Sequence, residues 1–231
     1  MNPQKKYTMA YFTNDFFDFF KQLAPNNNRE WFHAHKNDYE TYVKIPTQNF
    51  VDSVLRKLES TDNRFAQLTY KDCMFRINRD IRLSKDKSPY KLHIGIIFSP
   101  VGKKYKEYPG LYVELNPEHI RIYGGIYSPD RITLEKIRNL LIKHPKKFKS
   151  IIENDEFQSV YGEILGAKNK RLPKEMMEAA NKQPLLFNKQ LYFYNELPVD
   201  DALKDDFDQT IVNHYKIALP FFQFFEKAFK N

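Results

Sequence analysis

The first part of the chain has the apolar spacing of amphipathic helices. From residue 13 to 24, aromatic and aliphatic side chains recur at intervals of three and four positions, which predicts a helix with one apolar face. Pro25 and the asparagines that follow should end this helix, and a second helix is predicted from Asn27 onward. Pro46 should kink or restart that second helix, because a proline inside a helix removes a backbone hydrogen bond.

Downstream of these helices the apolar pattern changes to strict alternation. Residues 75–83 alternate apolar and polar side chains, which predicts a strand with one buried face and one wet face. Similar runs predict strands at 92–98, 111–115 and 120–122, and a turn at 116–119 should join the last two. Four strands in succession with short connections indicate a largely antiparallel sheet.

The rest of the chain is predicted to be largely helical, with helices beginning near Pro129, Pro145 and Pro173 and a long C-terminal helix. No linker or internal repeat marks a domain boundary. We therefore expect a single α+β domain over residues 1–231, with a largely antiparallel sheet of about four or more strands covered by helices. Within this domain, residues 1–10 could form a loose N-terminal tail.

Composition narrows the class of protein. The 20 Phe and 15 Tyr residues supply enough aromatic surface for a substantial core, which excludes a wholly disordered chain. The N-terminus lacks the apolar run of a secretory signal, and no later stretch approaches the roughly 18 apolar residues of a membrane span. We therefore expect a cytoplasmic protein. The single Cys73 cannot form an internal disulfide and lacks the spacing of a zinc site.

Several kinds of active site are excluded or disfavoured by the motifs. Glycine is scarce, and neither a phosphate-binding loop, nor a dinucleotide fingerprint, nor a G-x-S-x-G nucleophile turn is present. The histidines are scattered, and His33 and His35 would diverge by about 200° on a helix. An acidic run at 200–208 begins a predicted helix, where carboxylates favour the positive end of the dipole. No metal site is therefore expected.

The net charge of +8 should attract polyanions or phosphorylated ligands, and the densest group of polar residues is the basic segment, defined here as residues 76–91. On a strand, Arg76, Asp80 and Arg82 would point from one face, and the turn after them would add hydroxyl and ammonium groups. Guanidinium groups and turn amides bind phosphate or carboxylate. The candidate ligand-binding residues are Arg76, Arg79, Asp80, Arg82, Ser84, Lys85, Asp86, Lys87, Ser88, Tyr90 and Lys91.

Three functions remain open for the basic segment. It could bind, or carry out chemistry on, an anionic and phosphorylated ligand, with Asp80 or Asp86 as the acid/base candidate. A carboxylate among cations should have a lowered pKa, which suits a base or an orienting group better than a proton donor. The alternatives are nucleic-acid binding without catalysis, which the basic pI and nearby tyrosines favour, and docking of an acidic protein partner.

A fourth interpretation assigns no function to the basic segment. Its charges would then be exposed side chains on a half-buried sheet that pair with one another locally. Arg79 argues against it. An arginine in register with the apolar residues of a strand should be buried with a partner or mark a bulge, and both features are more frequent near functional sites. The residues identify no cofactor, no catalytic group and no oligomeric state.

The order and spacing of four motifs resemble a known family. The motifs are residues 26–32, the basic segment, residues 108–113 and residues 124–129. Together they resemble the bacterial and fungal family known as domain of unknown function 2461, over most of the chain, and we expect a bacterial source. Leu83 stands where that family more often has Phe. The resemblance implies one compact domain and supplies no catalytic residue.

Overall fold

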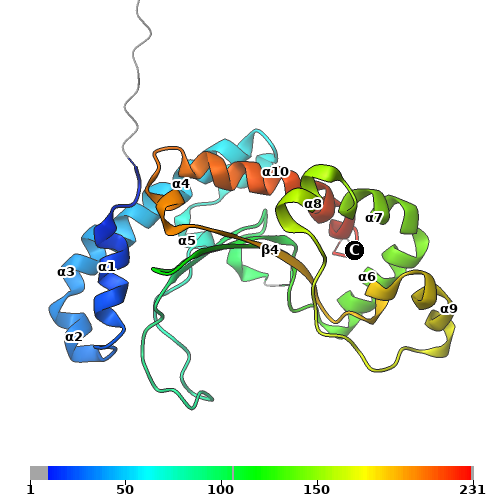
Figure 1. Ribbon diagram of the computed structural model, residues 1–231, viewed down its shortest axis with the longest axis horizontal. Coiled ribbons are helices and arrows are strands. Elements are labelled where there is room, and N and C mark those ends of the chain that lie inside the picture. Colours follow the sequence, from blue (N-terminus) through cyan, green and yellow to red (C-terminus); the bar gives the residue numbers. More distant parts are fainter. Residues whose placement is uncertain (1–9, 106, 230–231) are drawn as a thin grey trace, which may run out of the picture. The chain divides into compact units, whose positions relative to one another are not determined.

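The computed structural model describes residues 10–105 and 107–229, which form an α+β fold (Figure 1). Most of the predicted tail at residues 1–10 therefore lies outside the described residues. The chain divides into two compact units, and the expected single domain stays a prediction. Unit 1 comprises Met1–Ile96, Val113–Arg121 and Glu196–Asn213, and unit 2 comprises Ile97–Tyr112, Ile122–Asn195 and His214–Asn231.

The sheet contains four antiparallel strands in the order β1-β2-β3-β4, and the strands contribute residues to both units. The strands predicted at 92–98, 111–115 and 120–122 are confirmed. Burial alternates along β3, so its Ile residues face the core while the residues between them are partly exposed. The strands are β1 (Ile94–Phe98), β2 (Gly110–Leu115), β3 (Ile120–Ile126) and β4 (Leu191–Leu197).

The predicted turn between β2 and β3 is also present. The Asn116 N–H donates to the His119 carbonyl at 3.2 Å, and the Glu118 N–H donates to the Asn116 side-chain oxygen at 2.9 Å. An asparagine that accepts from the amide two residues later is a common way to stabilise a turn.

The strand predicted at residues 75–83 is wrong. This stretch is an extended loop that has no continuous ladder. It is flanked by the isolated bridge Met74–Ile96 to β1 and contains the isolated bridge Asn78–Tyr90 to the chain before β1. Beyond Asn78 the opposite chain offers Pro89, which has no N–H to donate. The expected alternation holds at Ile77, which is buried, and fails at Leu83, whose side chain is fully exposed (102%).

Strand β4 was not predicted from the sequence. Its alternation covers only Leu191 to Tyr194, where Leu191 and Phe193 are buried and Tyr194 is exposed, and it fades toward Leu197. From Tyr194 onward none of the strand residues is buried, and Asn195 and Glu196 are polar, so the apolar signal of β4 is short. The sequence signal that could have predicted this strand is the run Tyr192, Phe193 and Tyr194, because aromatic residues are enriched in strands.

Unit 1 holds the N-terminal helices, and the two helices predicted there are confirmed in outline. At Pro46 the helix changes its hydrogen-bonding pattern without a break. The π-helix η1 continues directly into α4, Lys44 and Ile45 both have helical backbone angles, and the Ile45 N–H donates to the Glu40 carbonyl. The elements are α1 (Asn14–Leu23), α2 (Arg29–Ala34), α3 (Lys36–Asp38), the π-helix η1 (Tyr39–Lys44), α4 (Ile45–Glu59), η2 (Asn63–Gln67), α5 (Tyr70–Cys73) and η5 (Val199–Leu203).

Unit 2 holds most of the C-terminal helices and an aromatic core. Phe193 of β4 packs against Phe157 at a ring separation of 4.9 Å and against Phe221 at 5.2 Å. Helix α10 (Phe207–Glu226) begins later than predicted and contributes to both units. The remaining elements are η3 (Gly102–Lys104), α6 (Arg131–Lys143), α7 (Pro145–Ile152), α8 (Asp155–Tyr161), α9 (Lys174–Lys182) and η4 (Pro184–Phe187).

A buried carboxylate ties together three segments of unit 1. Asp208 accepts hydrogen bonds from the Tyr11 hydroxyl at 2.9 Å, the Ser53 hydroxyl at 2.6 Å and the Lys57 ammonium at 2.7 Å. Burial by itself raises the pKa of Asp208, but the bonds from Lys57, Ser53 and Tyr11 outweigh it and leave the pKa below its ordinary value. The carboxylate of Asp208 is therefore ionised and structural.

Replacement of Asp208 by Ala should destabilise unit 1, because it leaves the Lys57 ammonium and two hydroxyl donors without their acceptor. We expect the free energy of unfolding to fall by about 3 kcal/mol in urea denaturation. The control is Asp18→Ala, which breaks an exposed pair with Lys21 and should change stability by less than about 1 kcal/mol. Equal effects of the two substitutions would contradict a structural role for Asp208.

Candidate functional site

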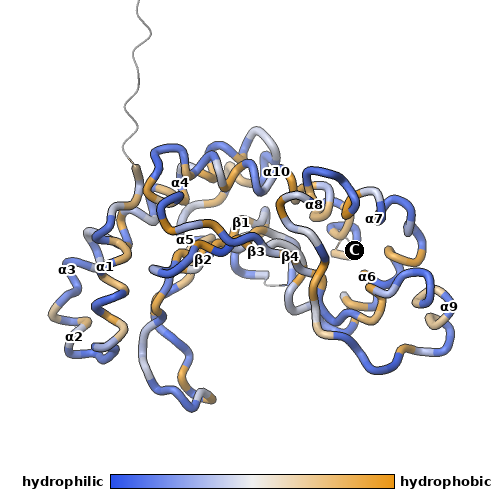
Figure 2. Tube along the Cα trace, in the orientation of Figure 1, coloured by the Kyte–Doolittle hydropathy of each residue, from blue (hydrophilic) through white to orange (hydrophobic). Residues whose placement is uncertain are grey.

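The basic segment forms a hydrophilic loop that leads away from the strands before the chain returns to β1 (Figure 2). Its base is held by the backbone, where the Arg79 N–H donates to the Pro89 carbonyl at 2.9 Å and the Lys91 N–H donates to the Ile77 carbonyl at 2.8 Å. Beyond this base the loop has no strand partner, so side chains must determine its conformation.

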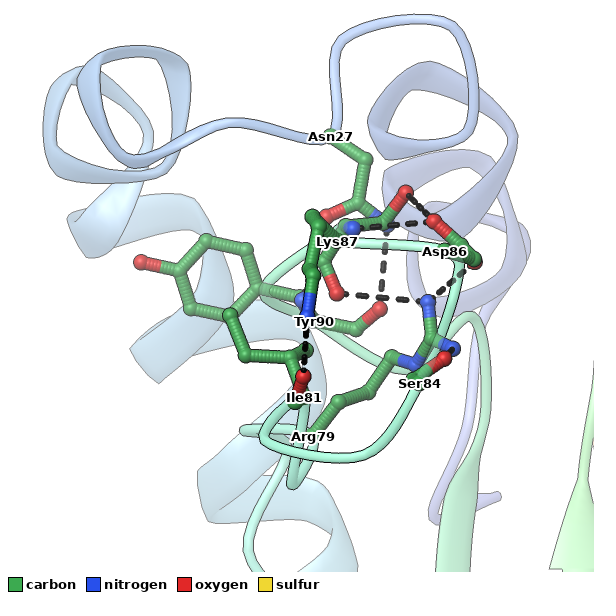
Figure 3. A network of polar contacts seen from close by, with 8 residues as sticks. Asn27, Arg79, Ile81, Ser84, Asp86, Lys87 and Tyr90 are labelled. Atoms are coloured by element: carbon green, nitrogen blue, oxygen red, sulfur yellow. Dashed lines mark hydrogen bonds and ion pairs between the residues drawn. The ribbon is translucent and has the colours of Figure 1, made fainter.

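The Arg79 guanidinium braces the loop from inside (Figure 3). It donates to the Ser88 carbonyl at 3.2 Å, to the Ser84 hydroxyl at 3.5 Å and to the Asp86 carboxylate, with which it forms an ion pair. The Arg79 side chain is 27% exposed. Arg79 therefore has the partner that its position predicts, and most of its hydrogen-bonding capacity is used within the loop.

Asp86 fixes the return turn of the loop. One of its carboxylate oxygens accepts from the Ser88 N–H at 2.9 Å and from the Ser88 hydroxyl at 2.7 Å. These bonds, together with the Arg79 pair, lower the pKa of Asp86 to about 2. The expectation of a lowered pKa is met, and Asp86 is an orienting anion at neutral pH instead of a proton donor.

Tyr90 joins the basic segment to the connection between α1 and α2. The Asn27 side chain donates to the Tyr90 carbonyl at 3.0 Å and accepts from the Tyr90 N–H at 3.1 Å, as a neighbouring strand would (Figure 3). The Phe32 ring stacks on the Tyr90 ring at 4.1 Å, and Tyr90 is buried. Tyr90 therefore anchors the base of the loop and is not presented to a ligand.

Four of the six cations of the basic segment are exposed. Arg82 and Asp80 form an exposed bidentate pair, in which Arg82 Nε donates to Asp80 Oδ1 at 2.9 Å and Arg82 Nη2 donates to Asp80 Oδ2 at 2.6 Å. These hydrogen bonds hold the pKa of Asp80 well below its usual range. This local pair replaces the arrangement on one strand face that was predicted for Arg76, Asp80 and Arg82. The Lys87 ammonium donates to the Ile81 carbonyl at 2.9 Å and stays exposed.

Nine of the eleven candidate residues divide into two groups, and Asp80 and Lys91 belong to neither. Within the described parts of the chain, neither Arg76 nor Lys85 takes part in an ion pair, and both side chains are exposed, although the charge of Arg76 contributes to the lowered pKa of Asp80. Lys91 is partly exposed, and its ammonium lies 5.7 Å from the centre of the Phe75 ring. The internal braces are Arg79, Ser84, Asp86, Ser88 and Tyr90, and the outward cations are Arg76, Arg82, Lys85 and Lys87.

Sequence reasoning missed a second polar group in unit 1. The Glu114 carboxylate lies 3.6 Å from the His93 imidazole and 3.4 Å from the His119 imidazole, so two histidines described as scattered share one carboxylate. Burial lowers the pKa of His93, although Glu114 opposes this effect. The hairpin predicted at 116–119 was the signal that could have brought Glu114 and His119 together.

Two negative findings apply to the residues that the structure describes. No group of three or more His, Cys, Asp and Glu side chains there has the arrangement of a metal site. This includes the group formed by Glu114, His93 and His119. Nor does any helix in residues 10–105 and 107–229 have the length and apolar character needed to cross a membrane.

The pKa of Asp86 should depend mainly on Ser88, whose hydroxyl and N–H are the largest causes of the shift. Ser88→Ala removes the hydroxyl donor, and the Asp86 pKa should rise from about 2 toward its ordinary value, as followed by NMR titration of the carboxyl carbon. Because this pKa is lowered by folding, the stabilising effect is present above about pH 4 and is lost as the pH falls through 2. An unchanged pKa in the variant would contradict the described turn.

Comparison with known proteins supports the family resemblance. The family model described as conserved hypothetical protein (DUF2461) matches residues 15–224, which is most of the chain and includes the whole basic segment. No curated protein matches the chain. The chain therefore belongs to the conserved hypothetical protein family DUF2461.

Proposed function

We propose that this protein binds an anionic, phosphorylated ligand at the basic segment. The observation that supports this most strongly is the division between internal braces and outward cations. Because Arg79 and Asp86 fix the loop through its own hydrogen bonds, the part of the loop that carries the outward cations is ordered before any ligand arrives. A preorganised loop loses less conformational entropy on binding, which favours affinity.

The charge of the segment supports the same proposal. Six Lys and Arg side chains and two carboxylates within residues 76–91 give a net charge of +4. Screening at physiological salt acts over about 8 Å, so neighbouring cations on one loop attract an anion together. Phosphate groups are the chemistry that such guanidinium and ammonium groups recognise most readily.

Binding is favoured over catalysis by the state of the two carboxylates. Asp86 is engaged by Ser88 and Arg79, and Asp80 is engaged by Arg82. Both have lowered pKa values and both already accept hydrogen bonds, which suits groups that orient cations. We therefore propose no catalytic residue, and the predicted cytoplasmic location stays a prediction.

A second candidate function is docking of an acidic protein partner. Its support is Leu83, a fully exposed leucine that lies between the exposed pair formed by Arg82 and Asp80 and the exposed Lys85. A large apolar side chain on a charged loop is typical of a contact with another protein, where it fills a pocket in the partner. Replacement of Leu83 by Ser would weaken such docking and would leave binding of a small anion unchanged.

The proposal is tested by charge reversal of one outward cation. Lys85→Glu should weaken binding of inorganic pyrophosphate at least about tenfold in calorimetry, because an attraction becomes a repulsion. The control is Lys36→Glu in α3, which makes the same change in net charge at another exposed lysine of unit 1. Failure of the native protein to bind pyrophosphate or any phosphorylated compound, or an equal loss in both variants, would contradict binding at the basic segment.

A further inference from the structure

Five tyrosines gather on one face of the strands of unit 2. The rings of Tyr112 and Tyr123 lie 6.2 Å apart, and those of Tyr123 and Tyr194 lie 5.7 Å apart. Tyr192 is two residues from Tyr194 on β4 and therefore shares its face, and Tyr127 packs edge-on against Tyr192 at 5.7 Å. We call Tyr112, Tyr123, Tyr127, Tyr192 and Tyr194 the tyrosine face.

The tyrosine face is not part of the core. Residues on the opposite side of the same strands, such as Leu111, Ile122 and Phe193, are buried, while Tyr194 is 43% and Tyr127 is 65% exposed. The interplanar angles are 48° between Tyr112 and Tyr123 and 30° between Tyr123 and Tyr194, so these rings are tilted and do not stack flat on one another. Neighbouring strands thus present successive aromatic rings along one surface.

The positive charge of the protein is concentrated in the unit that carries this surface. Unit 2 contains 19 Lys and Arg and ten Asp and Glu residues, for a net charge of +9. Unit 1 contains 18 basic and 19 acidic residues, for a net charge of −1, although it includes the basic segment. Without the basic segment, unit 1 would carry a net charge of −5, so the positive charge outside that segment is concentrated in unit 2.

Four of the cations in unit 2 flank β4. Residues 165–168 pair with residues 188–192 through the bridges Leu165–Tyr192 and Lys168–Asn188, which places this stretch beside the strand that carries Tyr192 and Tyr194. The exposed cations in or next to these two stretches are Lys168, Lys170, Arg171 and Lys189. None of the four is in an ion pair with a residue that the structure describes.

We propose that the tyrosine face binds single-stranded nucleic acid. Unpaired bases stack on aromatic rings in a way that tolerates any sequence, and exposed Lys and Arg side chains hold the phosphates. The surplus of positive charge in unit 2 selects a polyanion over an uncharged ligand such as a sugar chain. A duplex keeps its bases stacked inside, so it offers no base faces to the tyrosines.

The test is fluorescence anisotropy with labelled 12-nucleotide strands of oligouridylate and oligothymidylate and with a 12-base-pair duplex. Single strands of RNA, DNA or both should bind more tightly than the duplex. Tyr194→Ala should weaken binding about five- to a hundredfold, the range for loss of one stacked base. Tyr194→Phe keeps the ring and should stay within about twofold of the native protein.

A charge test complements the ring test. Lys168→Glu and Lys189→Glu should each weaken binding, and replacement of each residue by Ala should reduce the salt slope of the affinity by about one if it contacts a phosphate. Tyr194→Ala should leave binding of pyrophosphate unchanged, and Lys85→Glu should leave binding of the strands within about twofold. These two variants separate the tyrosine face from the proposed function of the basic segment.

Three results would overturn the inference. The first is no binding of either single strand at low salt, and the second is duplex binding as tight as single-strand binding. The third is native affinity in Tyr194→Ala combined with loss of strand binding in Lys85→Glu, which would assign the polyanion site to the basic segment. In each case the measurement of pyrophosphate binding tests the proposed function of the basic segment independently of the tyrosine face.

Discussion

The conformation of the basic segment depends on one guanidinium group. Between the bridge at Asn78–Tyr90 and its far end, the loop has no ladder of backbone hydrogen bonds that would fix its path. Arg79 replaces that ladder, since it bonds to a carbonyl, a hydroxyl and a carboxylate from the other side of the same loop. A side chain with five donors in one plane can satisfy partners that no single ammonium could bridge.

This arrangement explains why so many like charges are stable on one loop. Arg79 points inward and is matched by Asp86, and Arg82 is matched by Asp80, so repulsion among the cations is partly offset within the segment. Arg76 and Lys85 are exposed, are in no ion pair with the described residues and retain their capacity to attract an anion. The same chemistry that holds the loop together therefore leaves a surface suited to phosphate.

The outline of the fold could be predicted from the sequence, because helices and central strands carry strong periodic signals. Three strands and the turn at 116–119 are confirmed, while the alternation at 75–83 indicated a strand where a loop exists. Alternation shows which residues could form a strand, but it does not show whether a partner strand with free N–H groups lies opposite. Here Pro89 offers no N–H to a partner strand, and Arg79 points into the loop and bonds to the Ser88 carbonyl, so no strand forms.

The basic segment was chosen as the candidate site from the sequence, but the roles of its residues could not be predicted in the same way. Charge density identified the basic segment, whereas the contact of Tyr90 with Asn27, 63 residues earlier, has no sequence signal because it depends on tertiary packing. Tyr90 was grouped with ligand-binding residues and instead supports the loop. The location of the charge surplus in unit 2 also required the structure, since its residues come from three separate stretches of chain.

The central claim is that the outward cations of the basic segment bind a phosphorylated ligand. The most direct measurement is backbone amide NMR of the native protein during titration with inorganic pyrophosphate. The account predicts that saturable shifts concentrate within residues 76–91, strongest around Arg76 and Lys85, with the loop base at Tyr90 little changed. Shifts confined to other parts of the chain, or none at a millimolar excess, would contradict it.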